Sequence, residues 1–291
     1  MMKKFNQQNK EIRFGSYIFG PVVMRMYYLL NKPEDALKAF KDPDMEGFFS
    51  QLGTYQILMD LLYENEMHQD VLDIFEIVKG RQHQDSKYPR NVVILTLAAC
   101  YKLNTPESYK FAMDLWKELK EVGHFPMRRA VTFAAAIALN HNAPHVALEI
   151  VSSITQQNYV TVRNIKALAL AEVGRPEDAL LVLRSVLDID IPTQNKQTFS
   201  SNVFINEVKA EIEKSGNKEM VVDFEHLEKR LAEGGHITRM GLNEQLCSQI
   251  AEVSRNQIEE RNRGFLAASF NRQDTRNRSR EYARPGLKDM Y

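Results

Sequence analysis

Two histidines and two cysteines are the side chains of this sequence best suited to hold a metal ion or to act as nucleophiles. His141 and His145 are four residues apart, but Pro144 lies between them at an expected turn. Cys100 and Cys247 are far apart, and neither has a second ligand nearby. The sequence contains no HExxH, CxxC or GxSxG motif and no glycine-rich phosphate loop. We therefore expect a protein that is not an enzyme and that needs no metal or cofactor.

Basic side chains form a second group of candidate functional residues, because they attract phosphates. Arg128 and Arg129 open one apolar stretch, and Arg163 and Lys166 lie in the next one. On adjacent helices these four residues would form a positive stripe that contacts RNA. The alternative is ordinary solvated charge.

The end of the chain is also basic, with Arg276, Arg278 and Arg280 among few acidic residues. An arginine-rich, partly disordered end is suited to bind the phosphates of RNA. It is equally suited to dock a protein or to keep the chain soluble.

The overall composition limits how such basic groups act. Lys plus Arg equals Asp plus Glu, at 38 each, so the formal net charge is zero. This balance argues against indiscriminate nucleic-acid binding over the whole surface. There is no apolar run of about 18 residues, so we expect no membrane span. The first residues, 1–13, are basic but lack an apolar core, so they resemble neither a secretory signal nor a clear organellar presequence.

The elements that must position these residues are repeated pairs of helices. Small residues recur in similar local sequences at intervals of about 35 residues, the length of a helix–turn–helix repeat; they are Ala36, Val71, Ala112, Ala147 and Ala179. A proline often precedes them by three residues, and proline is tolerated at the first position of a helix. The pattern predicts the second helix of each pair, with a first helix before it.

The predicted fold is an all-α, right-handed superhelical solenoid. About six pairs are expected within residues 16–233, at 16–41, 54–79, 91–121, 130–156, 160–188 and 197–233. Residues 1–15 should be flexible, 234–270 should form a capping helix that closes the end of the stack, and 271–291 should be a disordered arginine-rich tail. No strand is expected. The alternative is an irregular helical bundle.

One unit carries a family resemblance. Residues 54–62, Thr-Tyr-Gln-Ile-Leu-Met-Asp-Leu-Leu, and residues 70–76, Asp-Val-Leu-Asp-Ile-Phe-Glu, resemble the two helices of the pentatricopeptide repeat. Residues 112–119 and 147–151 repeat the second-helix pattern, and residues 131–133 repeat the opening of the first. The resemblance implies a protein of the mitochondrial matrix that binds organellar RNA and supports its maturation, stability or translation, and so the respiratory chain.

In repeats of this family each unit faces about one base with two or three side chains. Alignment with the repeat places the base-facing position at Gln56 and at Asn164. In two other pairs it falls at Ile94 and Ala134, which cannot make the expected hydrogen bonds. A base-by-base code is therefore not expected, and the aromatic residues, Trp116 included, are interpreted as core.

Two functions remain open. The first is a mitochondrial RNA-binding factor that acts on single-stranded RNA by occupancy. The alternative is a protein-interaction scaffold, or a helical-repeat protein of the mitochondrial ribosome, with RNA-processing or ribosomal proteins as partners. The neutral charge and the poor base-facing positions favour the alternative, whereas the family resemblance and the arginine-rich tail favour the first function.

Overall fold

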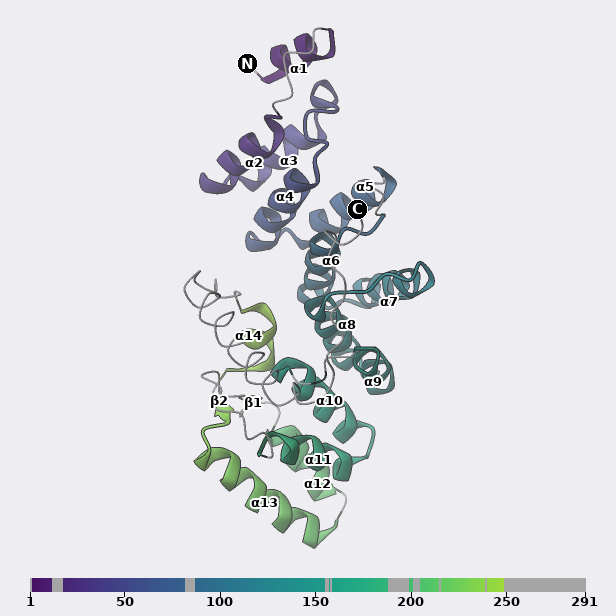
Figure 1. Cartoon of the computed structure of the whole chain (residues 1–291), viewed down its shortest axis with the longest axis vertical. Coiled ribbons are helices and arrows are strands. Elements are labelled where there is room, and N and C mark those ends of the chain that lie inside the picture. The colour runs from purple at the N-terminus through teal and green to yellow at the C-terminus, as the bar shows by residue number, and fades with distance from the viewer. Residues whose placement is uncertain are drawn as a thin grey trace, which may run out of the picture. The chain divides into compact units, whose positions relative to one another are not determined.

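A computed structural model describes residues 2–11, 18–81, 87–154, 157, 159–187, 199–200, 205–214, 216–238 and 240–248. The described part consists almost entirely of antiparallel helix pairs (Figure 1). The pairs are α2 (Gly20–Leu29) with α3 (Pro33–Lys41), α4 (Leu52–Glu64) with α5 (His68–Arg81), α6 (Arg90–Leu103) with α7 (Pro106–Glu121), α8 (Arg128–Asn140) with α9 (Pro144–Ser152), α10 (Val160–Glu172) with α11 (Pro176–Leu187), and α12 (Asn206–Lys214) with α13 (Lys218–Glu233). The expected all-α helical-repeat fold is confirmed, and the handedness of the superhelix stays a prediction.

The local sequence explains where the second helices begin. Pro33, Pro106 and Pro144 occupy the first turn of α3, α7 and α9, where the missing N–H costs no hydrogen bond. At α7 the Thr105 hydroxyl accepts from the Ser108 N–H, and the Ser108 hydroxyl accepts from the Thr105 N–H. This capping box satisfies two backbone donors at once.

A residue with a left-handed backbone closes each of the turns between paired helices. These residues have φ between +47° and +82°, and they are Asn31, Glu66, Asn104, Asn142, Gly174 and Gly216. Asparagine and glycine adopt this conformation at low cost, whereas glutamate does not. Glu66 is therefore the least favourable residue of the series.

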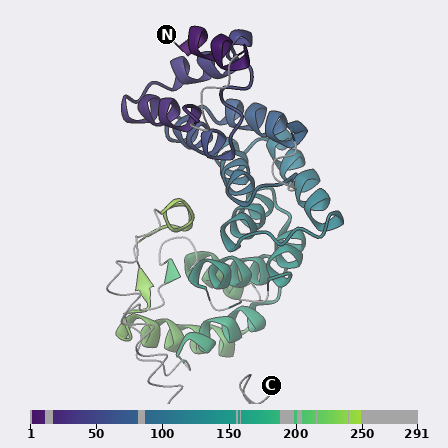
Figure 2. The ribbon, with the colours of Figure 1, turned by 45° about the horizontal axis from the view of Figure 1, so that its top comes forward.

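Packing follows one rule from pair to pair (Figures 1 and 2). The first helices α2, α4, α6, α8 and α10 each contact the next in that order, and we call them the first-helix layer. Each second helix also packs on the first helix of the following pair, as α5 does on α6 and α9 on α10. Figure 2 shows the same succession of helices from another direction. This regular progression is what a solenoid requires and an irregular bundle lacks.

The small residues of the repeat lie at the centre of this packing. Each is completely buried, with an exposed fraction of 0%: Ala36, Val71, Ala112, Ala147 and Ala179. The first helices α8 and α10 are also rich in buried alanine, with Ala134 and Ala169 as examples. Short side chains let the helix backbones approach closely, so the repeat deduced from spacing is also the repeat of the core.

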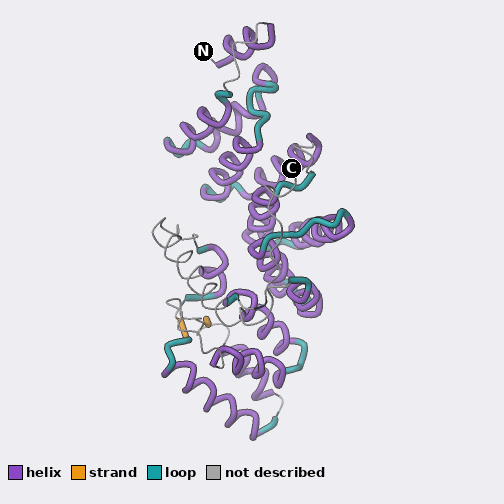
Figure 3. Tube along the Cα trace, in the orientation of Figure 1, coloured by secondary structure: helices purple, strands orange, loops and turns teal. Residues whose placement is uncertain are grey.

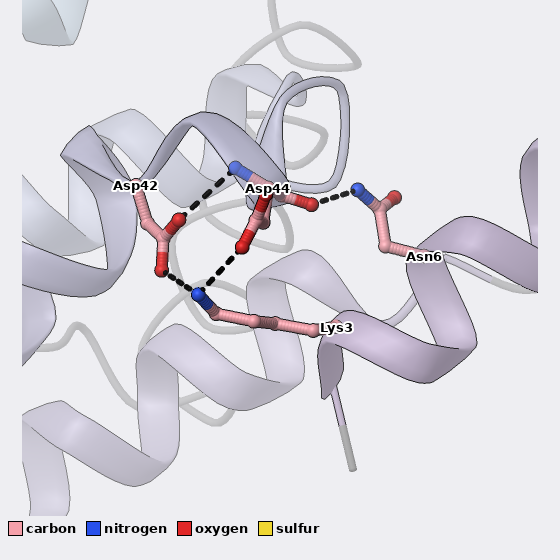
Figure 4. Close-up of polar contacts among 4 residues, drawn as sticks. All are labelled: Lys3, Asn6, Asp42 and Asp44. Carbon is pink, nitrogen blue, oxygen red and sulfur yellow. Dashed lines mark hydrogen bonds and ion pairs between the residues drawn. The ribbon is translucent and has the colours of Figure 1, made fainter.

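The N-terminal segment differs from the flexible stretch expected at 1–15, because residues 2–11 form a helix, α1 (Met2–Glu11). Lys3 Nζ lies 2.8 Å from carboxylate oxygens of both Asp42 and Asp44 (Figure 4). Asn6 Nδ2 donates to the carbonyl oxygens of Asp44 (2.9 Å) and Glu46 (3.2 Å). These contacts hold α1 against the short helix η1 (Pro43–Met45) that follows α3.

The C-terminal part of the described chain also departs from expectation. A pair of two-residue strands, which no sequence signal indicated, joins β1 (Phe199–Ser200) to β2 (Ile237–Thr238) in parallel, with Phe199 opposite Ile237 (Figure 3). The capping helix expected at 234–270 is described only as α14 (Leu242–Cys247). Its principal helix contacts are with α8 and α10, not with the last pair, so the described helix does not close the end of the stack. The expected tail, 271–291, lies outside the described residues.

Candidate nucleic-acid interface

Charge is separated between the two kinds of helix. α6 and α8 carry only basic charged residues, and α10 carries one acid at its last position; the charged residues of the three helices are Arg90, Lys102, Arg128, Arg129, Arg163, Lys166 and Glu172. The second helices α7, α9 and α11 carry most of the acids of the same pairs. The first-helix layer is therefore basic around α6, α8 and α10, although the whole chain is neutral.

The helix ends reinforce this separation. No first helix from α2 to α10 has an acidic residue in its first turn, whereas the second helices α3, α5, α7 and α11 do. The N-terminus of a helix bears about half a positive charge, which acidic side chains normally offset. The uncompensated ends of the first helices add to the basic character of their layer and favour an anionic ligand.

Arg128 makes the most specific arrangement in this layer. Its guanidinium carbon lies 3.4 Å from the centre of the Tyr159 ring, a cation–π contact that links the start of α8 to the residue before α10. Tyr159 is 40% exposed. An exposed tyrosine with a stacked arginine offers flat faces for a nucleobase and a charge for a phosphate. The expectation that all aromatic residues belong to the core is therefore wrong for Tyr159, whereas Trp116 is buried as expected.

Arg129 and Lys166 lie in the same layer and are half-buried. Burial, with the neighbouring Arg128, lowers the pKa of the Arg129 guanidinium from its ordinary value. Lys166 Nζ donates to Gln157 Oε1 at 3.4 Å. Both residues are therefore placed by protein contacts at the edge between core and surface.

Arg163 and Asn164 lie deeper than a stripe of surface charge would. They are 5% and 1% exposed, and burial lowers the pKa of the Arg163 guanidinium. Asn164 Nδ2 donates to Gln245 Oε1 of α14 at 2.7 Å, while Asn164 Oδ1 has no hydrogen-bond partner in the described structure. The Asn164 amide is therefore neither exposed to solvent nor open to a base in this structure, because α14 covers it.

The remaining predicted positions do not join this cluster. Gln56 is half-buried on α4, Ile94 is half-buried on α6 and Ala134 is completely buried in α8. Gln56 and Ile94 thus lie at a similar depth, whereas Ala134 lies in the core. Arg276, Arg278 and Arg280 lie outside the described residues.

The contacts of α14 reveal polar residues that the sequence did not single out. Tyr63 Oη of α4 lies 3.6 Å from Cys247 Sγ, and Lys102 Nζ of α6 donates to Asn243 Oδ1 at 3.4 Å. Burial raises the pKa of Tyr101 to about 12, and the Cys247 thiol adds to the effect. Their sequence positions carry no signal, because the partners come from a segment more than a hundred residues away.

Of the two histidines considered first, His145 is exposed on α9 and His141 contacts an aromatic ring. His141 stacks on Tyr109 with ring centres 4.8 Å apart. Within the described residues, no group of three His, Cys, Asp or Glu side chains is arranged to hold a metal ion. Over the same residues, no helix is both long enough and apolar enough to cross a membrane.

Comparison with known proteins identifies relatives that match most of the chain. No protein-family profile matches the chain. The human pentatricopeptide repeat-containing protein 2, mitochondrial, is 30% identical over 84% of this chain and 62% of its own length. The proteins of the same name from Danio rerio and Mus musculus are 30% and 31% identical, over 85% and 84% of this chain and 63% of their own lengths. The chain thus spans less than two thirds of the length of these relatives.

Proposed function

From its resemblance to the mitochondrial pentatricopeptide repeat-containing proteins 2, we propose that this chain is an RNA-binding helical-repeat protein. The names of these relatives bear out the mitochondrial location expected from the repeat. The protein binds single-stranded mitochondrial RNA and acts by occupancy, protecting a transcript or presenting it for maturation. In this way it supports the respiratory chain.

The charge of the first-helix layer is the observation that supports this proposal. A protein without net charge does not attract RNA through its overall charge. A ligand with many phosphates must therefore meet a local basic surface. α6 and α8 provide one, with no acidic residue in either helix. Arg128 on the Tyr159 ring adds a stacking surface at the same layer.

Substitution of Arg128 and Arg129 tests the interface. We expect the double variant Arg128→Ala, Arg129→Ala to weaken binding of a single-stranded RNA by about tenfold, since loss of each charged contact typically costs on the order of 1 kcal/mol. Fluorescence anisotropy with a labelled RNA of mixed sequence measures the change. Lys110→Ala on α7 removes an exposed basic residue from a second helix and should leave binding unchanged. Equal losses in both variants would contradict a site on the first-helix layer.

The role in the organelle is tested by crosslinking. Ultraviolet crosslinking in mitochondria, followed by sequencing of the bound RNA, should recover discrete mitochondrial transcripts. Recovery of ribosomal RNA alone, together with ribosomal proteins, would favour the second function.

That second function is a protein-interaction scaffold, and a different surface favours it. One face of α2 exposes the large apolar side chains of Val22, Met26 and Leu29, and Ile18 just before the helix is also exposed. Such a stripe is typical of a surface that binds another protein. Loss of co-purifying proteins in a Val22→Ser, Leu29→Ser variant that still binds RNA would assign the two functions to separate surfaces.

A further inference from the structure

The short helix α14 makes contacts along an unusual length of the first-helix layer. Its side chains meet Tyr63 of α4, Lys102 of α6 and Asn164 of α10. Its backbone also packs against α8 and α10. A helix of six residues therefore bridges consecutive first helices on the face that is basic and that carries Asn164.

Two of the three polar contacts just named are weak, and the third leaves one atom of the Asn164 amide without a partner. The bond between Lys102 and Asn243 is exposed and long, and the contact of Tyr63 with Cys247 uses sulfur, a weak hydrogen-bonding atom. Asn164 donates through its nitrogen, but its buried oxygen has no partner. A buried amide oxygen without a partner is costly, so the closed arrangement leaves an interaction for a ligand to gain.

We propose that α14 is a reversible cover over an RNA-binding site formed by Tyr63, Tyr101, Lys102, Arg129 and Asn164, and that RNA binds by displacing it. This inference rests on the proposed function and adds its regulation. Gln245 offers the Asn164 amide one acceptor. A nucleobase edge presents an acceptor beside a donor, so it satisfies both groups of the amide.

The other residues beneath α14 suit the remaining parts of a nucleotide. Tyr63 and Tyr101 offer aromatic faces to bases, and Lys102 and Arg129 offer charge to phosphates. These groups come from three different first helices, so a single strand laid across the layer meets them in turn. α14 and RNA compete for the same side chains, and each must weaken the binding of the other.

Releasing α14 should therefore strengthen RNA binding. Leu246 is the buried anchor of this helix, with 2% exposure, and Leu246→Ser weakens its attachment without adding charge. We expect the full-length variant to bind a labelled single-stranded RNA of mixed sequence about tenfold more tightly, within the usual range of such couplings. Glu244→Gln, at an exposed position of the same helix, is the matched control and should bind as the wild type does. Gln245→Ala is a second release variant that leaves the apolar anchor in place.

The two cysteines report the position of α14 independently of affinity. Cys247 lies on α14 and is half-buried, whereas Cys100 is buried in α6 with a pKa raised to about 12 by burial. A maleimide should label Cys247 faster when RNA is added, and faster without RNA in Leu246→Ser. Cys100 should stay unlabelled in all samples, which shows that the fold is intact.

The outcomes separate this inference from the function on which it rests. Tighter binding by the release variants, together with RNA-dependent labelling of Cys247, supports both. If the wild type binds RNA but the release variants bind no more tightly and labelling of Cys247 is unchanged by RNA, the cover is refuted and RNA binding stands. If neither the wild type nor the release variants bind RNA, both ideas fail.

Discussion

Glu118 shows how one carboxylate connects successive parts of the stack. It accepts from Lys79 of α5 at 3.0 Å and from Tyr88, just before α6, at 2.5 Å. The bond from Lys79, followed by that from Tyr88, lowers the pKa of Glu118 below its ordinary value of 4.5. A carboxyl group whose pKa is lower in the folded state stabilises the fold above its unfolded pKa and loses this effect as the pH falls through the folded pKa.

This sign gives a prediction at the residue scale. At pH 7 we expect Glu118→Gln to lower the free energy of unfolding by less than about 1 kcal/mol, since Glu118 is partly exposed and solvent screens the pair. The difference from the wild type should shrink as the pH falls below 4.5. Urea denaturation at several pH values measures it. Glu121→Gln removes a charge from the same helix, where the distance to Lys117 is 4.0 Å, and should have a smaller effect; equal effects at pH 7 would mean that the hydrogen bonds of Glu118 contribute nothing.

At the scale of the element, the turn within each helix pair recurs with the same left-handed backbone conformation. Asn31, Asn104 and Asn142 occupy the left-handed position in three of these turns, and Glu66 occupies it in another. Asparagine bonds locally to the backbone and tolerates this conformation, whereas glutamate has no such compensation. The turn between α4 and α5 should thus be less stable than the turns that have asparagine at this position.

Replacing that glutamate should stabilise the protein. We expect Glu66→Asn to raise the free energy of unfolding by about 0.5–1 kcal/mol, through relief of backbone strain. A comparison variant, Asn142→Ala, places a side chain that cannot bond locally at φ +54°. It should lower the free energy of unfolding by a similar amount. Thermal denaturation followed by circular dichroism compares the two. A lower melting temperature for Glu66→Asn would show that the glutamate side chain makes a compensating contact.

At the scale of the whole molecule, zero net charge hides an uneven distribution. The basic first helices α6 and α8 are balanced by acids on the second helices and elsewhere. The arginine-rich segment that follows residue 270 would add a second, sequence-independent source of phosphate contacts. In an interface of this kind, charged contacts to phosphates position the RNA, and contacts to bases recognise its sequence.

The contribution of that segment can be measured from salt dependence. Replacing Arg276, Arg278 and Arg280 together by Ala should weaken RNA binding equally for all sequences. It should also reduce the slope of log affinity against log salt by up to about 2, since each phosphate contact to a single strand contributes about 0.7. Replacing the same three residues by Lys keeps the charge and should keep the slope. An unchanged slope in the alanine variant would remove the tail from the interface.

The sequence predicted the helix pairs well because their determinants are local. Pro106 and Ala112 mark the start and the buried face of a helix within a few residues, and the same signals recur in each unit. The place of Arg128 and Arg129 at the start of a first helix likewise made them candidates for an interface. The contact of Asn164 with Gln245 joins residues 81 positions apart, and no local pattern encodes such a pair. The same reason explains why the docking of α14 on the first-helix layer and the strands β1 and β2 escaped prediction: they depend on distant partners.

The docking of α14 brings together parts of the chain that are far apart in sequence, whereas most described helix pairs contact only the adjacent pairs. Neighbouring pairs touch within a few dozen residues, but Tyr63 and Cys247 are 184 positions apart. Closing so long a loop costs chain entropy, which the buried Leu246 and the polar contacts of α14 offset. As the reversible cover proposed above, α14 would therefore dissociate while each pair of helices stays folded.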